Sequence, residues 1–264
     1  MNEPIPTVKS RPYQVRFDAG RYPRAKLGFV VLAMEQTVEE DAFRLAPPGV
    51  GVHFSRLAMS NDAIIENLEG MEPGIAEAAA LLRPEDDLDV VSYTCNCGTM
   101  VIGEERVTAA LAAGRPGAKT TTVMTGVVRS LRALGAKRIA VATPYTDDIN
   151  ARVMGFLQGH GFEVVAFQGL NLNTNLEIDL VAPDYLFEFG RSVDRADAEA
   201  LFICCGALRT LDIVDRLETA VAKPVVVSNQ AMMWDALRLA GIDDKLEGYG
   251  RLFELGSEAR ERAA

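Results

Sequence analysis

Two stretches decide the fold: residues 88–99, Leu-Asp-Val-Val-Ser-Tyr-Thr-Cys-Asn-Cys-Gly-Thr, and residues 199–207, Glu-Ala-Leu-Phe-Ile-Cys-Cys-Gly-Ala. Each begins with a short apolar run that is too brief for a helix and is typical of a buried parallel strand. Each run ends at a cysteine, and a helical pattern follows. Cys95 and Cys205 therefore occupy the same position in two copies of one strand–helix unit.

The same alternation of elements extends outward through both halves of the chain. Further apolar runs predict strands at residues 26–33, 51–58, 138–143 and 162–167. Helical patterns cover residues 35–45, 61–82, 147–159 and 185–191, and one further helix follows each cysteine. Strands that alternate with helices predict an α/β fold. We expect two pseudo-symmetric domains, each a parallel sheet flanked by helices, with the active site in the cleft between them.

The expected domain bounds follow from this repeat. Residues 25–118 plus 226–264 form the first domain and residues 119–225 the second. Residues 1–24 form an N-terminal arm that contains four prolines and no hydrophobic segment, so the arm is not a signal peptide. We expect this arm to pack on a partner subunit of a homo-oligomer.

Composition limits the kinds of partner. Of the 264 residues 48% are apolar and 24% charged, which is ordinary for a globular protein, and the formal net charge is -10. This charge argues against nucleic acid or an anionic membrane as partner, and no apolar stretch approaches the roughly 20 residues that span a bilayer. Four cysteines without a secretion signal predict reduced thiols in a cytoplasmic protein.

The paired cysteines carry the predicted chemistry. Ligands of open parallel sheets bind beyond the carboxyl ends of the strands, so Cys95 and Cys205 are expected to face one cleft. The N-terminus of a following helix would lower the pKa of each thiol. Two thiols could then deprotonate and protonate opposite faces of a substrate, or one could add to a carbon–carbon double bond. Cysteine often only fills core space, but two equivalent strand ends favour a catalytic pair.

The expected substrate-binding residues lie around this pair. They are Gln36, Asn96, Cys97, Tyr145, Asn173, Gly206 and Ala207. A small carboxylate would be held by the backbone N–H groups beside Gly206 and by the amide side chains. For some members a structural role is the alternative: helix capping for Gln36, interdomain packing for Tyr145 and a simple turn for Asn173.

Metal and nucleotide sites have little support. Cys95-x-Cys97 and the adjacent Cys204-Cys205 are not standard zinc-ligand spacings. The chain has neither a Walker-type glycine-rich loop nor a strand-linked Gly-x-Gly-x-x-Gly. We therefore expect neither a metal nor an organic cofactor.

These motifs also resemble a known family. The two-cysteine repeat resembles the aspartate/glutamate racemase superfamily, and Thr143-Pro-Tyr145 with Leu208-Arg-Thr-Leu211 is similar to its branch of maleate cis–trans isomerases and arylmalonate decarboxylases. Residues 228–242 most resemble the ectoine-utilization proteins of that branch. The resemblance implies two α/β domains, an interdomain site and no cofactor.

The resemblance also implies a reaction. It suggests an isomerase or racemase of a small carboxylate, either a maleate-like dicarboxylate or an amino acid. Cys95 would be the nucleophile and Cys205 its proton partner, while Tyr145 and Asn173 would bind the substrate carboxylates. The arylmalonate decarboxylases lack the first cysteine, whereas this chain keeps it. Decarboxylation is therefore the less favoured alternative. A binding protein of ectoine catabolism without turnover is a further alternative.

Two positions depart from the family pattern. Gln36 stands where the isomerases have asparagine, and Cys97 replaces a smaller residue. Arg209, beside the second cysteine motif, could select an additional acidic group or form a surface salt bridge.

Overall fold

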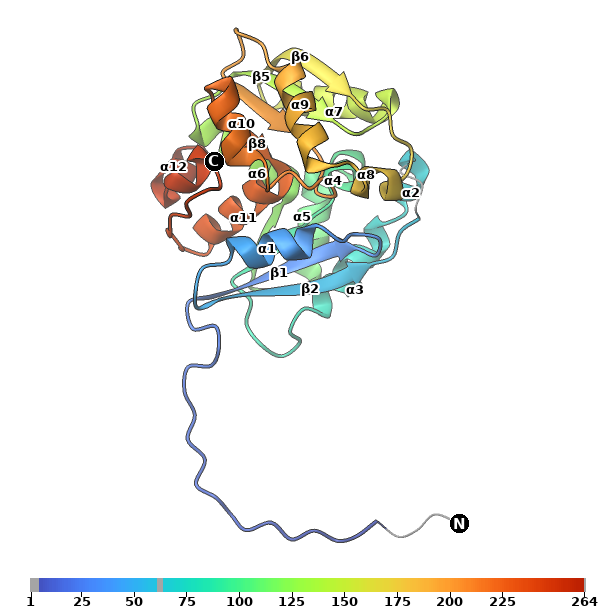
Figure 1. Cartoon of the computed structure of the whole chain (residues 1–264). Helices are drawn as coiled ribbons and strands as arrows, with labels where there is room; N and C mark the ends of the chain where they lie inside the picture. The colour runs from blue at the N-terminus through green and yellow to red at the C-terminus, as the bar shows by residue number, and fades with distance from the viewer. Residues whose placement is uncertain (1–4, 61–63, 264) are drawn as a thin grey trace.

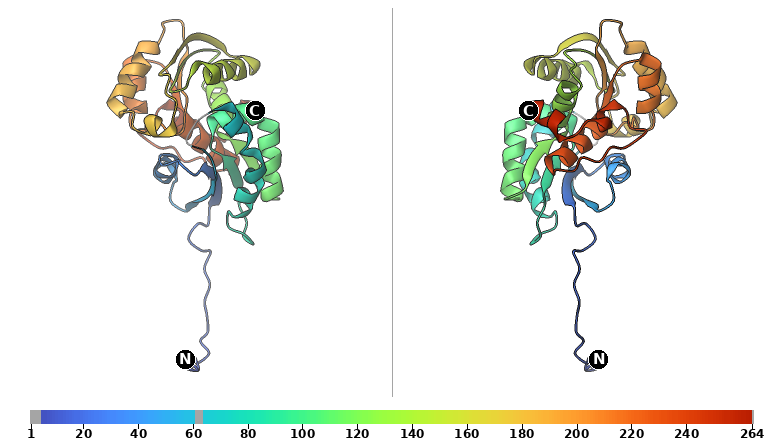
Figure 2. Two further views of the ribbon diagram at one scale, coloured as in Figure 1. Left: turned by 90° about the vertical axis from the view of Figure 1, so that its right-hand side faces the viewer. Right: turned by 90° about the vertical axis from the view of Figure 1, so that its left-hand side faces the viewer.

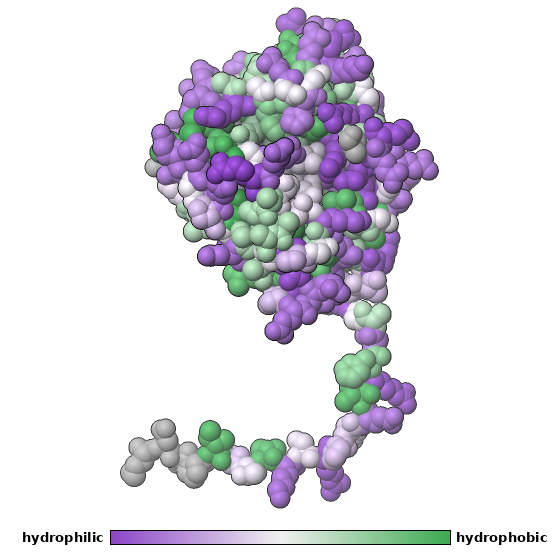
Figure 3. Space-filling model, turned by 180° about the vertical axis from the view of Figure 1, so that it is seen from behind, coloured by the Kyte–Doolittle hydropathy of each residue, from purple (hydrophilic) through white to green (hydrophobic). Residues whose placement is uncertain are grey.

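The structure is a computed structural model, and it describes residues 5–60 and 64–263. Residues 5–24 form an extended arm, without helix or strand, that leaves the body of the molecule (Figure 1). Its side chains Ile5, Tyr13 and Phe17 are exposed. Figure 3 shows green, hydrophobic residues along the arm. No helix in these ranges is long and apolar enough to cross a bilayer.

The first half of the chain forms a four-stranded sheet of order β2-β1-β3-β4, in which all pairs are parallel. Its central strands are apolar and buried on both faces, as parallel sheets covered by helices require. The strands are β1 (Ala25–Leu32), β2 (Val50–Leu57), β3 (Val90–Tyr93) and β4 (Lys119–Thr122).

The second half repeats this topology as β6-β5-β7-β8, again with parallel pairs only. Its strands are β5 (Arg138–Thr143), β6 (Glu163–Gly169), β7 (Ala200–Ile203) and β8 (Val225–Val227). Figure 2 shows the half built on β5–β8 above the half built on β1–β4. The predicted fold class, two pseudo-symmetric α/β halves with parallel sheets, is confirmed.

The helices cover the faces and edges of the two sheets. They are α1 (Val38–Leu45), α2 (Ile65–Glu69), α3 (Glu72–Ala80), α4 (Asn96–Ile102), α5 (Glu104–Gly114), α6 (Val123–Ala133), α7 (Asp147–Gly159), α8 (Asn175–Asp179), α9 (Pro183–Val193), α10 (Val214–Val221), α11 (Ser228–Leu239) and α12 (Ser257–Arg262), with a 3-10 helix, η1 (Arg251–Glu254).

Several predicted elements need correction. The polar β4 and the three-residue β8 were not among the expected strands, because neither shows a long apolar run. The expected helix over residues 61–82 is two helices, α2 and α3, and residues 61–63 lie outside the described ranges. The helix after Cys95 is likewise divided, because Gly103 adopts a φ of 102° between α4 and α5.

Helices α6 and α11 pack against each other where the two halves meet. A Cβ added at Gly126 of α6 would lie 2.9 Å from the carbonyl oxygen of Ala231 on α11, so only glycine permits this approach. The predicted division into a first domain of residues 25–118 plus 226–264 and a second of residues 119–225 stays a prediction. The prediction assigned β4 to the second domain, but β4 pairs in the first sheet; β8, which spans the predicted boundary at residue 226, pairs in the second.

Candidate active site

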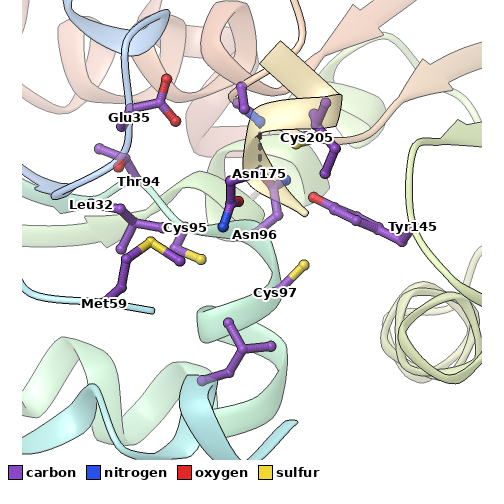
Figure 4. A pocket seen from close by; sticks show the side chains of 14 residues that line it. Leu32, Glu35, Met59, Thr94, Cys95, Asn96, Cys97, Tyr145, Asn175 and Cys205 are labelled. Carbon is purple, nitrogen blue, oxygen red and sulfur yellow. Dashed lines mark hydrogen bonds between the residues drawn. The ribbon is translucent and has the colours of Figure 1, made fainter. Parts of the chain in front are cut away.

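A narrow pocket lies beyond the carboxyl ends of β3 and β7, at the place where the sequence predicts a site (Figure 4). The centre of a water-sized sphere can occupy about 40 Å³ of it, which is room for only a few water molecules. Its lining residues are Leu32, Glu35, Met59, Leu68, Thr94, Cys95, Asn96, Cys97, Tyr145, Asn175, Ile178, Cys205, Gly206 and Ala207.

Cys95 connects β3 to α4, as predicted. It is the N-cap residue of α4, and its Sγ accepts a hydrogen bond from the backbone N–H of Gly98 at 3.2 Å. A Cβ added at Gly98 would lie 2.4 Å from the hydroxyl oxygen of Tyr93, so glycine is needed at this position. The helix terminus thus holds the first thiol from one side.

Cys205 has a different local structure, which corrects the predicted helix start. Turns follow β7, and α10 begins only at Val214. The backbone of Cys205 has a φ of 117°, a region that non-glycine residues rarely adopt. Its N–H donates to Oγ of Ser228, the first residue of α11, at 2.9 Å. The surrounding contacts, instead of a helix terminus, place the second thiol.

Asn96 links the two cysteine segments. Its Nδ2 donates to Oγ of Ser228 at 2.9 Å, and its Oδ1 accepts from the N–H of Gly206 at 3.2 Å, the bond drawn in Figure 4. The predicted ligand-binding amide therefore has structural partners on both of its polar atoms. Asn96, the residue after Cys95, is thus hydrogen-bonded to Gly206, the residue after Cys205.

A tyrosine hydroxyl interacts with each thiol. The hydroxyl of Tyr145, which follows β5, lowers the pKa of Cys205 and also that of Cys97 and Cys204. The hydroxyl of Tyr93, at the end of β3, lowers the pKa of Cys95 and donates to Sδ of Met71 at 4.0 Å. Tyr145 was among the predicted site residues, whereas Tyr93 was not. The signal for Tyr93 was its spacing, since a strand residue two before Cys95 lies on the same face.

Burial dominates the electrostatics of both thiols. Burial raises the pKa of Cys95 to about 11, although the N–H of Gly98 and the hydroxyl of Tyr93 act in the opposite direction. Burial also raises the pKa of Cys205 to about 12, against the Tyr145 hydroxyl and the N–H of Ala207. The expected lowering by helix termini is thus outweighed by desolvation, and both thiols are neutral near pH 7.

Cys97 lines the pocket, as expected, and burial raises its pKa well above the ordinary value. Cys204 is fully buried behind the site, with its sulfur 3.5 Å from Nδ2 of Asn96. Within the described ranges no group of three or more His, Cys, Asp or Glu side chains is placed to hold a metal ion.

The structure places Gln36 outside this pocket, and its role in substrate binding stays a prediction. Its exposed side chain lines an adjoining groove, while Glu35 lines the pocket. Oε1 of Glu35 accepts hydrogen bonds from the N–H groups of Gln36 and Thr37, which hold the carboxylate at the start of α1.

Asn173 also lies outside the pocket, in a separate groove. Its N–H donates to Oε2 of Glu177 at 3.2 Å. Glu177 and Thr174 form a capping box that starts α8, and Asn175 in the first turn of α8 lines the pocket instead. Thr174-x-x-Glu177 matches the capping-box pattern, so the sequence did contain a signal for this placement.

Comparisons with known proteins identify the family of the chain. The profile of the arylmalonate decarboxylase family matches residues 103–253. The arylmalonate decarboxylase of Bordetella bronchiseptica is 38% identical over 141 residues, which cover 52% of this chain and 59% of that protein, less than two thirds of its length. The maleate isomerase of Nocardia farcinica is 27% identical over 242 residues, 88% of this chain and 96% of that protein.

Solved structures extend the similarity to the whole fold. A Nocardia farcinica maleate cis–trans isomerase mutant with a covalently bound succinylcysteine intermediate has a TM-score of 0.81 at 25% identity, covering 87% of this chain and 98% of that one. A liganded arylmalonate decarboxylase mutant has a TM-score of 0.78 at 28% identity, covering 87% and 99%. The family match spans more than half of the sequence, and the chain therefore belongs to the arylmalonate decarboxylase family.

Proposed function

We propose that this protein is a cofactor-independent isomerase or racemase of a small carboxylate, with Cys95 and Cys205 as its catalytic pair. The observation that carries the proposal is that two thiols from equivalent strand ends line one narrow pocket. Charge on Cys95 raises the pKa of Cys205, so the two groups are electrostatically coupled. The similarity to maleate isomerases supports the same reaction class.

The geometry suggests how an isomerisation would proceed. The ionised Cys95 sulfur, stabilised by the Gly98 N–H and the Tyr93 hydroxyl, adds to one alkene carbon, and the neutral Cys205 thiol gives its proton to the other. Rotation about the new single bond follows. Cys205 then takes the proton back as the C–S bond breaks and the double bond re-forms.

The same pair supports a racemisation. One ionised thiol removes the proton beside the substrate carboxylate, and the other thiol protonates the opposite face. The carboxylate spreads the developing charge over its oxygens. Tyr145, Gly206 and Ala207 line the pocket on the Cys205 side and are the proposed carboxylate contacts. For Gln36 and Asn173 no such contact is proposed, since both lie outside the pocket.

A decarboxylase is the second candidate, and the 38% identity to the Bordetella enzyme favours it. A role in ectoine catabolism, a binding protein without turnover, a homo-oligomer and a cytoplasmic location stay predictions.

The two reactions can be separated by proton NMR in D2O with maleate, aspartate, glutamate, hydantoins and phenylmalonate as substrates. We expect isomerisation or deuterium incorporation, and a loss of about 10²–10⁴-fold in the Cys95→Ser and Cys205→Ser variants. Cys204→Ser is the matched control, because this thiol lies behind the pocket. Full activity in both serine variants would exclude the thiol pair, and release of CO2 alone would establish the decarboxylase.

A further inference from the structure

The charge of the pocket wall is the observation to explain. Of the described residues that line the pocket, Glu35 alone has a formally charged side chain, and no Lys, Arg or His accompanies it. A dicarboxylate would bring two further negative charges to this wall. Like charges repel strongly at a desolvated site, so the wall disfavours a simple dicarboxylate.

Glu35 is held rigidly in this position. Its Oε1 accepts from the backbone N–H groups of Gln36, Thr37 and Val38 at 3.0, 2.7 and 3.1 Å. These bonds use one oxygen and favour the ionised form. Figure 4 shows the Glu35 carboxylate among the side chains drawn around the pocket. Burial nevertheless raises its pKa, as expected for a carboxylate without a nearby cation.

A second carboxylate, Asp179, adds to the negative charge near Glu35. Asp179 is the last residue of α8 and is only 7% exposed. Its charge raises the pKa of Glu35, so the two groups lie close together. Burial raises the pKa of Asp179, while a hydrogen bond with Gln36 and the positive charge of Arg209 act in the opposite direction.

Glu35 and Asp179 stand where the pocket meets an outer groove. Consecutive residues line the two spaces: Glu35 and Ile178 the pocket, Gln36 and Asp179 the groove. Arg44 and Arg209 line the groove beside Asp179, whereas no cationic side chain lines the pocket beside Glu35. A positive group on the ligand would therefore offset the charge of Glu35. A protonated amine suits this place, since it supplies both positive charge and N–H donors.

Glu35 lines the same pocket as Cys95 and Cys205, and its charge raises the pKa of both thiols. A positive group bound at Glu35 would oppose this effect and favour the thiolate. Substrate binding and activation of the nucleophile would then be coupled.

We propose that Glu35, supported by Asp179, is the specificity-determining residue of this pocket and receives a protonated amine of the substrate. The substrate is then an amino-substituted carboxylate, and simple dicarboxylates are disfavoured. This assignment rests on the proposed function, since it places the amine beside the carbon that the two thiols act on.

The test compares wild type with Glu35→Gln, which keeps an oxygen for the three N–H groups. The amine probes are D- and L-aspartate, glutamate and ornithine, and the probes without an ammonium group are maleate, succinate and N-acetylaspartate. Turnover is followed by deuterium exchange and affinity by calorimetry. Glu105→Gln is the control for loss of a charge, because Glu105 is exposed on α5 away from the pocket.

We expect wild type to prefer at least one amine probe, and Glu35→Gln to weaken that binding by about 10–100-fold, the usual effect of losing a hydrogen bond to a charged group. The same variant should bind N-acetylaspartate or a dicarboxylate at least as well as wild type. Asp179→Asn should cause a smaller loss, and Glu105→Gln none. Thermal unfolding of each variant verifies that it folds.

The outcomes separate this inference from the proposed function. Two results would overturn the amine subsite. One is that wild type prefers dicarboxylates and Glu35→Gln keeps full activity; the other is that no amine binding depends on Glu35. The thiol chemistry can stand in either case. Amine binding that depends on Glu35 without any deuterium exchange supports the subsite and contradicts the proposed catalysis.

Discussion

The reactivity of the two thiols is set by their individual surroundings. Burial raises the pKa of Cys95 to about 11 and that of Cys205 to about 12, so each thiol is a proton donor near neutral pH. The nucleophilic form needs stabilisation when the substrate is bound. The tyrosine hydroxyls and backbone N–H groups beside the sulfurs supply part of it.

The raised pKa values predict an unusual alkylation profile. The rate of iodoacetamide labelling at Cys95 should keep rising up to about pH 10, because the thiolate fraction grows until the pH passes the pKa. An ordinary cysteine in a peptide levels off at about its pKa of ~8.5. Peptide mass spectrometry of timed samples measures both rates. A plateau at Cys95 below about pH 8 would contradict this.

Gly98 provides a second test at a single position. Gly98→Ala places a Cβ against the Tyr93 hydroxyl and should force that group away from Cys95. We expect a loss of about 1–3 kcal/mol in the free energy of unfolding and a lower kcat. Urea unfolding and the deuterium-exchange assay measure the two effects. Gly155→Ala in α7 is the control, since a Cβ there meets no atom within 4 Å.

Among the elements, the short helix α8 closes one side of the pocket. Asn175 and Ile178 line the pocket from this helix, and the capping box between Thr174 and Glu177 holds its start. A helix of five residues has little intrinsic stability, so its cap contributes a large part of its order.

Removal of the α8 cap should therefore affect substrate binding. Thr174→Ala should lower stability by about 0.5–2 kcal/mol and raise KM while kcat changes less, because the pocket wall loosens without loss of a reacting group. Urea unfolding and steady-state kinetics measure both. Thr108→Ala on α5, whose hydroxyl bonds only backbone carbonyls, serves as control. An unchanged KM would show that α8 keeps its position without the cap.

Across the whole molecule, buried polar side chains join segments that are far apart in the sequence. Nδ2 of Asn229 on α11 donates to Asp41 of α1 and to the carbonyl of Gly206, each at 2.8 Å. Burial raises the pKa of Asp41 to about 7 from its usual 3.8. This carboxyl therefore makes the stability of the assembled fold depend on pH.

The sign of that dependence follows from proton binding. Between about pH 4 and pH 7 the folded protein keeps a proton on Asp41 that the unfolded chain has released, so the free energy of unfolding falls as pH rises. Asp41→Asn should reduce this slope and should be more stable than wild type by roughly 1–4 kcal/mol at about pH 8. Urea unfolding at several pH values measures the slope. Parallel curves for wild type and variant would disprove the assignment.

Much of the architecture was predictable from local pattern. The apolar runs of β1, β3, β5 and β7 end where ligands of parallel sheets bind, and two of them end at Cys95 and Cys205. The weak strands β4 and β8 were missed because a polar or a three-residue segment has no periodic signal of its own. Their place in the sheets depends on pairing with β3 and β7.

The sequence by itself determined the repeat, the α/β class and the two cysteines at equivalent strand ends, because hydrophobic periodicity and duplication are properties of the chain. The tertiary structure alone decided which polar side chains reach the pocket. It turned Glu35 inward in place of Gln36 and put Asn175 where Asn173 was expected. It also left both thiols neutral, since desolvation depends on everything packed around a group and outweighs the local effect of a helix end.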